Sequence, residues 1–171
     1  MYIGLGIVAG IIIIILVYTM IIKPQQIKKE INAKIDMFIK YTDFKDIKQS
    51  KICDRIISNG SDKIYIKYVM VPSNSQITIN CKEKWRLSWG GSSAKVGRAY
   101  PNNRFMKEVE EFANISLDGK KVFIIYYTTE HILKYINECE LETIDITKKT
   151  YDYKLVCYDK FDQDFAYVVN N

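Results

Sequence analysis

The stretch that decides the fold is Cys53–Val69, which reads CDRIISNGSDKIYIKYV. Asn59 and Gly60 tolerate the positive φ angles of a tight turn, so residues 58–62 predict the turn of a β-hairpin. The residues after the turn have strand composition. An acid, Asp54, opens the first arm. An acid at this position often binds a metal ion together with a second acid on the facing strand. In this chain the facing arm has Lys67 and Val69 at the corresponding positions.

Apolar periodicity on both sides of the hairpin predicts the remaining elements. The apolar run 121–128 is typical of a strand buried on both faces. Before the hairpin we expect a helix over 27–39 and a polar connection over 41–51. After the hairpin we expect strands within 76–89 and a helix from Asn102 or Asn103 to about 114. The buried strand 121–128 is then followed by a helix over 130–140, a short strand over 142–146 and an edge strand in the tail. This order predicts an α/β fold with a mixed sheet.

An uncharged apolar run, residues 3–22, precedes the hairpin domain. At about 1.5 Å per residue, a helix of this length spans the roughly 30 Å core of a bilayer. A signal peptide would need basic residues before a shorter apolar core and a small-residue cleavage site, so we expect a retained transmembrane helix. Gly6 and Gly10 form a small-xxx-small pair that favours a homodimer through this helix.

The flanking charges predict the orientation of the membrane helix. No basic residue precedes it, whereas Lys23, Lys28, Lys29 and Lys34 follow it. The positive-inside rule then predicts a single-pass membrane protein with its soluble domain in the cytoplasm. We expect a membrane helix over 1–23, an α/β domain over 24–150 and a strand or tail over 151–171.

The composition argues against a metal centre built from cysteine and histidine. The chain has 4 cysteines, which are far apart in sequence, and 1 histidine, His131. Structural zinc sites use closely paired ligands of these types, so we expect no metal ligands here. The net charge of +5 suits anionic lipid or nucleic acid, and it equally suits an ordinary soluble surface.

Several short motifs occur along the chain in an order that can be compared with a known family. They are Glu30 in the first helix, the Asp54-led hairpin arm DRIISNG, Trp85, the segment YPNNR at 100–104 and the strand and following segment 122–136. This series resembles the nuclease-related domain (NERD) family, over roughly residues 27–146. The resemblance implies a restriction-endonuclease-like, three-layer core with a mixed sheet, and a magnesium-dependent nuclease site.

The departures from the family pattern decide the expected activity. The family's second acid falls at Lys67, its lysine at Val69 and its glutamine at Arg104. Magnesium needs hard oxygen ligands, and a lysine repels it. The resemblance therefore implies that Glu30, Asp54 and Lys67 mark a degenerate catalytic site, with no cofactor. The alternative is an active nuclease that binds Mg²⁺ through a migrated carboxylate, for which the candidates are Glu83, Glu108 and Glu111.

A second feature is the densest basic and aromatic region of the sequence. Its members are Lys82, Lys84, Arg86, Lys95 and Arg98, interleaved with Trp85, Trp89 and Tyr100. Such interleaving suits phosphates and bases, although it also suits strands that pack beneath lysine stems. We therefore expect a catalytically inactive, membrane-anchored domain that binds nucleic acid or a protein partner near the membrane. A structural membrane scaffold is a further alternative.

Overall fold

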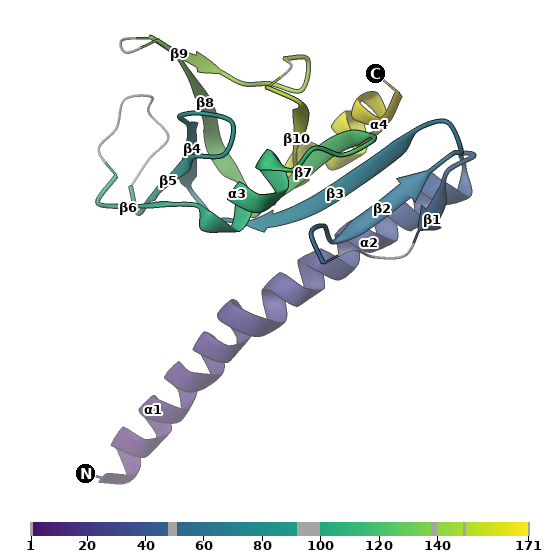
Figure 1. Cartoon of the computed structure of the whole chain (residues 1–171). Coiled ribbons are helices and arrows are strands. Elements are labelled where there is room, and N and C mark those ends of the chain that lie inside the picture. The colour runs from purple at the N-terminus through teal and green to yellow at the C-terminus, as the bar shows by residue number, and fades with distance from the viewer. Residues whose placement is uncertain (1, 48–50, 92–99, 138–139, 149, 171) are drawn as a thin grey trace. The chain divides into compact units, whose positions relative to one another are not determined.

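The structure is a computed structural model of the chain (Figure 1). It describes residues 2–47, 51–91, 100–137, 140–148 and 150–170. The chain divides into two compact units, Met1–Met37 and Phe38–Asn171, and each is described by itself.

The first unit is helical, as the sequence predicts. It consists of α1 (Tyr2–Val17), a π-helical turn, η1 (Tyr18–Ile22), and most of α2 (Lys23–Lys40). Within η1 the Lys23 N–H donates to the Tyr18 carbonyl, five residues back. Pro24 comes next, and its ring would clash with a carbonyl four residues earlier in a regular α-helix, which explains the widened turn.

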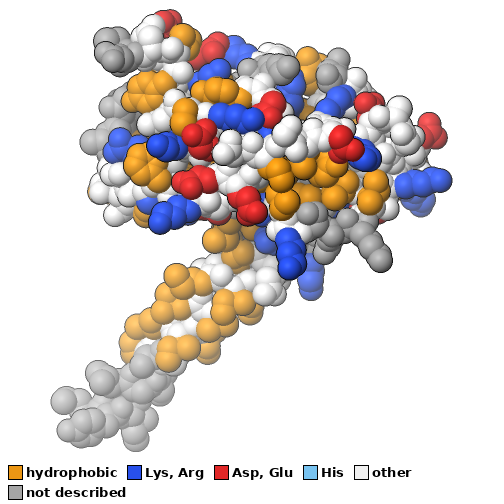
Figure 2. All heavy atoms as spheres, in the orientation of Figure 1, with side chains coloured by type: hydrophobic (Ala, Val, Ile, Leu, Met, Phe, Trp, Pro, Cys, Tyr) orange, Lys and Arg blue, Asp and Glu red, His pale blue; other side chains and the backbone are white. Residues whose placement is uncertain are grey.

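One helix in the described residues, Gly10–Lys40, is long and apolar enough to span a membrane. Figure 2 shows hydrophobic side chains along the surface of the N-terminal helix. Isoleucines 11 to 15 are all exposed, each by 51% or more. Such a surface is typical of a helix that faces lipid. Dimerisation through Gly6 and Gly10 stays a prediction.

The second unit contains two five-stranded sheets, and sheet A holds the hairpin. Its strands, in spatial order, are β1 (Lys45–Ile47), β2 (Arg55–Ser58), β3 (Lys63–Met70), β7 (Lys120–Tyr126) and β10 (Tyr153–Cys157). β2 is antiparallel to β1 and to β3, whereas β3, β7 and β10 run parallel. The predicted hairpin and buried strand are confirmed, and the tail contributes the edge strand β10. The prediction of a polar connection is wrong for β1, an exposed three-residue edge strand.

Sheet B is also mixed. Its strands, in spatial order, are β6 (Asn102–Phe105), β5 (Trp85–Trp89), β4 (Ser75–Ile79), β8 (Thr129–Asn137) and β9 (Glu140–Thr143). Only the β4–β8 pair is parallel. The α/β class is confirmed, but with two mixed sheets in place of the one expected.

The two sheets meet at a corner that two chain segments cross together. The β3–β4 and β7–β8 connections both pass from sheet A to sheet B (Figure 1). The Val71 N–H donates to the Tyr126 carbonyl at 2.6 Å, and the Tyr127 N–H donates to the Val71 carbonyl at 3.3 Å. The parallel pairing of β3 with β7 therefore continues into that of β4 with β8.

The predicted helix over 130–140 is wrong, because residues 130–137 belong to strand β8 and Glu140 begins strand β9. Ile132 and Leu133 are buried, and Ile132 pairs with Ile77 in the parallel ladder. The apolar spacing fits a helix as well as a strand. However, the chain passes directly from β7 to the unpaired edge of β4, where the backbone N–H and carbonyl groups of β4 need hydrogen-bond partners. The ladder with β4 decides the conformation, and no helical crossover follows β7.

The predicted helix from Asn102 or Asn103 begins later than expected. Residues 102–105 form the exposed edge strand β6, and α3 covers only Lys107–Asn114. Its buried positions, Val109, Phe112 and Ala113, share one face as predicted. β6 satisfies the free edge of β5, so the asparagines pair in a sheet rather than cap a helix. The short strand expected over 142–146 lies at Glu140–Thr143.

The main core lies between the two sheets and α3. Its centre is aromatic: the ring of Phe123 lies 4.7 Å from that of Trp85, 5.0 Å from that of Phe112 and 5.2 Å from that of Tyr153. These edge-to-face and tilted pairs add to the burial of large apolar areas. The chain ends in a short 3₁₀ turn, η2 (Tyr158–Lys160), and α4 (Phe161–Asn170), which packs on β10.

Candidate functional site

The hairpin places Asp54 against the second arm by two hydrogen bonds. Its backbone N–H donates to the Ile66 carbonyl at 2.9 Å. Its carboxylate accepts the Tyr68 N–H at 2.8 Å. Asp54 is thus bound to the residues on either side of Lys67. One carboxylate oxygen is already engaged by the backbone, which fixes the acid just before the start of β2.

Lys67 and Val69 point away from the Tyr68 side of the sheet, since successive side chains of a strand face opposite ways. In the described part of the chain, Lys67 forms no ion pair with Asp54. Val69 is 1% exposed and belongs to the main core. Glu30 lies in α2, in the first unit, whereas Asp54 and Lys67 belong to the second.

Arg55, next to Asp54, forms an ion pair of its own. Its guanidinium donates two hydrogen bonds to the Asp46 carboxylate, at 3.3 and 2.9 Å. The Arg55 side chain is 8% exposed, whereas that of Asp46 is 53% exposed. The neighbouring acid that neutralises Arg55 is therefore supplied by β1 and is not Asp54.

Two tyrosines lie close to the Asp54 carboxylate. Burial raises the pKa of Tyr126 to about 12, and the negative charge of Asp54 acts in the same direction. Burial also raises the pKa of Tyr68, against the opposing effect of Arg55. Both phenols therefore stay protonated at neutral pH. They therefore place no second negative charge near Asp54.

The carboxylates proposed for a rearranged metal site do not gather around Asp54. Glu108 forms a two-pronged ion pair with Arg104, at 2.6 and 2.9 Å. Burial works to raise the pKa of Glu108, but the hydrogen bonds and charge of Arg104 outweigh it, so this pKa lies below its ordinary value. Among the described residues, no group of three or more His, Cys, Asp or Glu side chains is arranged to hold a metal ion.

The predicted nucleic-acid-binding residues differ in their surroundings. The Lys82 ammonium lies 2.9 Å from the Asp152 carboxylate, which also pairs with the buried Lys121 at 2.7 Å. Lys84 and Arg86 are exposed. Lys95 and Arg98 lie outside the described residues. Of the interleaved aromatic residues, Trp85 is fully buried in the core, where its Nε1–H donates to the Tyr153 hydroxyl at 3.1 Å.

Arg86 lines a groove on the open face of sheet B, the face turned away from the core. The groove has a volume of ≈ 320 Å³. It is lined by Gln76, Thr78, Asn80, Arg86, Ser88, Tyr100, Asn103, Tyr135 and Leu141. Its floor consists of amides and hydroxyls, and tyrosines contribute to its lining from two distant segments. Arg86 is the only charged side chain among these residues.

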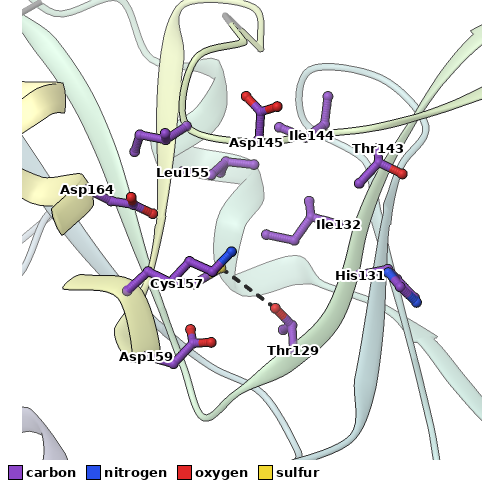
Figure 3. Close-up of a pocket in the computed structure, with 12 residues that line it drawn as sticks. Thr129, His131, Ile132, Thr143, Ile144, Asp145, Leu155, Cys157, Asp159 and Asp164 are labelled. Atoms are coloured by element: carbon purple, nitrogen blue, oxygen red, sulfur yellow. Dashed lines mark hydrogen bonds between the residues drawn. The ribbon is translucent and has the colours of Figure 1, made fainter. Parts of the chain in front are cut away.

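A second pocket, of ≈ 250 Å³, lies between β8, β10 and the start of α4 (Figure 3). Three acids line it: Asp145, Asp159 and Asp164. Burial raises the pKa of Asp164, and the charges of the other two acids act in the same direction. The Thr129 hydroxyl and the Cys157 thiol lie 3.8 Å apart at one wall. The acidic character of this pocket is opposite to that of the groove on sheet B.

Sequence reasoning missed three residues of the open face: Phe105, Tyr135 and Leu141. Phe105 and Tyr135 fall within the two predicted helices, and Leu141 falls between predicted elements. In the structure all three are exposed, by 57%, 39% and 47%. No alternation in β8 marks Tyr135 as an exposed residue, because Ile132 and Leu133 are buried in succession and residues 135–137 are exposed in succession.

Comparisons with known proteins place the chain in no family. No family model matches it, and neither a curated protein nor a solved structure matches it.

Proposed function

We propose that this protein is a membrane-anchored domain that faces the cytoplasm, binds nucleic acid near the membrane and does not cleave it. The observation that carries the proposal is the set of residues that the hairpin has at the positions of the expected metal site. Asp54 is held by the Tyr68 N–H, and the positions where the resembled family has its second acid and its lysine are occupied by Lys67 and the buried Val69. A two-carboxylate magnesium site has no second ligand there.

A restriction-endonuclease-like core is part of the proposal. Its support is the Asp-led hairpin within a mixed sheet of five strands, in which only β2 runs against the others. The departure is equally clear, because β8 replaces the helix that the resemblance implies after the buried strand. The scaffold is proposed to have kept its sheet while the residues at the hairpin changed.

The cytoplasmic placement is supported by the charges beside the apolar helix. Lys23, Lys28 and Lys29 follow the uncharged run closely. Basic residues close to a transmembrane helix favour the cytoplasmic side, and each also attracts anionic lipid by about 1 kcal/mol. The domain would therefore work close to the inner surface of the membrane.

The test uses the full chain in detergent micelles with Mg²⁺ or Mn²⁺ and labelled single-stranded and duplex DNA and RNA. Both cleavage and gel retardation are followed, at low and moderate salt. We expect retardation that weakens as salt rises, with no cleavage. Metal-dependent cleavage that disappears in Asp54→Ala would overturn the proposal in favour of an active nuclease. Absence of retardation for every nucleic acid would overturn the nucleic-acid ligand.

A further inference from the structure

We infer that the open face of sheet B is the binding surface, and that its ligand is a single-stranded nucleic acid. This inference rests on the proposed function and deepens it by naming the surface and the form of the strand. It depends on the side chains that the ladder of sheet B brings together, on their charge and on the size of the groove.

The register of sheet B arranges the outward side chains in rows across the strands. Arg86 pairs with Thr78 on one side and with Phe105 on the other. Ser88 pairs in the same way with Gln76 and Asn103. The first row therefore places a cation beside an exposed aromatic ring. The second is a row of uncharged donors and acceptors that suits sugar hydroxyls and base edges.

The charge of this surface favours an anionic ligand. Arg86 is exposed and has no ion-pair partner among the described residues. Three carboxylates on the neighbouring elements are engaged elsewhere: Glu108 binds Arg104, Glu142 binds Lys148 and Glu140 accepts a hydrogen bond from the Asn137 amide. None of the described residues that line the groove is acidic, so these residues do not repel a phosphate bound at Arg86.

The aromatic side chains of this face favour bases over other anions. Tyr100 and Tyr135 line the groove, and Phe105 is exposed on the adjoining row. Aromatic rings bind single strands because every base has a face on which they stack, at about 1–3 kcal/mol per base. The bases of a duplex are already stacked on one another. A groove of ≈ 320 Å³ is of the size that takes one small-molecule ligand, such as one nucleotide of an opened strand, rather than a double helix.

The experiment measures binding of the full chain, in detergent micelles without divalent metal, to labelled single strands of roughly 16 nucleotides and to the matching duplexes. The variants are Arg86→Gln and Tyr135→Ala. Lys45→Gln and Tyr41→Ala are the matched controls, because they replace exposed residues of the same chemistry outside sheet B. Unchanged melting temperatures check that all four variants fold.

We expect single strands to bind more tightly than duplexes. Tyr135→Ala should weaken binding by roughly fivefold to a hundredfold, the loss of one stacked base. Arg86→Gln should weaken binding and lower the slope of log affinity against log salt by about 0.7, the loss of one phosphate contact on a single strand. The controls should bind as the wild type does.

The failures are distinguishable. Wild-type-like binding by both groove variants overturns this inference and leaves the proposed function intact. Preference for duplexes also overturns the inference alone. If the wild-type chain binds no nucleic acid, both fail, and the open face of sheet B is left to a protein partner.

Discussion

The guanidinium of the buried Arg55 is neutralised by Asp46, which reaches it from the edge strand β1 through hydrogen bonds of 3.3 and 2.9 Å. This relationship fastens the three-residue β1 to the hairpin. The neighbouring acid, Asp54, accepts the Tyr68 N–H instead.

Asp46→Ala should lower the free energy of unfolding by about 1–3 kcal/mol, because it leaves a buried guanidinium without this carboxylate. The measurement is urea denaturation of the full chain in detergent micelles. Asp43→Ala, at an exposed position three residues earlier, is the control and should change stability by less than about 0.5 kcal/mol. Equal effects of the two substitutions would contradict the structural role of the pair.

Asp152 should contribute to stability in a pH-dependent way. Burial works to raise its pKa, but hydrogen bonds from Lys121 and Lys82 outweigh it and hold this pKa below its ordinary value. A lowered carboxyl pKa gives stability that is fully present above the unfolded-state pKa of about 4 and is lost as pH falls through the folded-state value. Melting temperatures of wild type and Asp152→Asn should therefore differ at pH 7 and converge in acid. A difference that stays constant down to pH 3 would refute this.

The pKa of Tyr126, which burial raises, should also depend on the negative charge of Asp54. With the pKa of Tyr126 raised to about 12, its ionisation should follow that of exposed tyrosines, and the difference spectrum between wild type and Tyr126→Phe isolates it. Since the neutral phenol is favoured by folding, this contribution to stability is complete below pH 10 and is lost as pH rises toward 12. Asp54→Asn should lower the pKa of Tyr126. An unchanged titration in this variant would show that the two groups do not interact.

The orientation of the membrane helix should depend on the lysines beside it. A reporter enzyme that is active only outside the cytoplasm, fused after Asn171, should be inactive on the wild-type chain. Replacing Lys23, Lys28 and Lys29 by glutamine and adding lysines before Ile3 should give active reporter in a measurable fraction of molecules. Reporter activity on the unaltered chain would place the domain on the other side of the membrane.

Local chemistry made the hairpin and the apolar helix predictable. Asn59 and Gly60 specify a turn without help from the rest of the chain, and Gly60 indeed has a φ of 95°. The run of isoleucines likewise identifies its helix by composition alone. The buried strand β7 was predictable because an apolar run that is covered on both faces has few alternatives.

Long-range pairing made β1, β6 and β8 unpredictable from the sequence. The sequence of β8 has apolar spacing that suits a helix, and only the open side of β4 makes it a strand. β1 and β6 are short exposed edges, each held by one neighbouring strand. The candidate groove depends on β6 and β8 together, so sequence analysis found Arg86 and Tyr100 but not the surface to which they belong.

The parallel corner between the sheets also dictates when this domain can fold during synthesis. The parallel ladder partner of Ile64 is Lys120, and that of Gln76 is His131, so each lies about 55 residues further along the chain. Non-local pairings of this kind form slowly, and domains fold as units once their partners have been made. The apolar helix leaves the ribosome long before either partner does. The nascent chain is therefore expected to reach the bilayer first and to complete both sheets afterwards, while already tethered to the membrane.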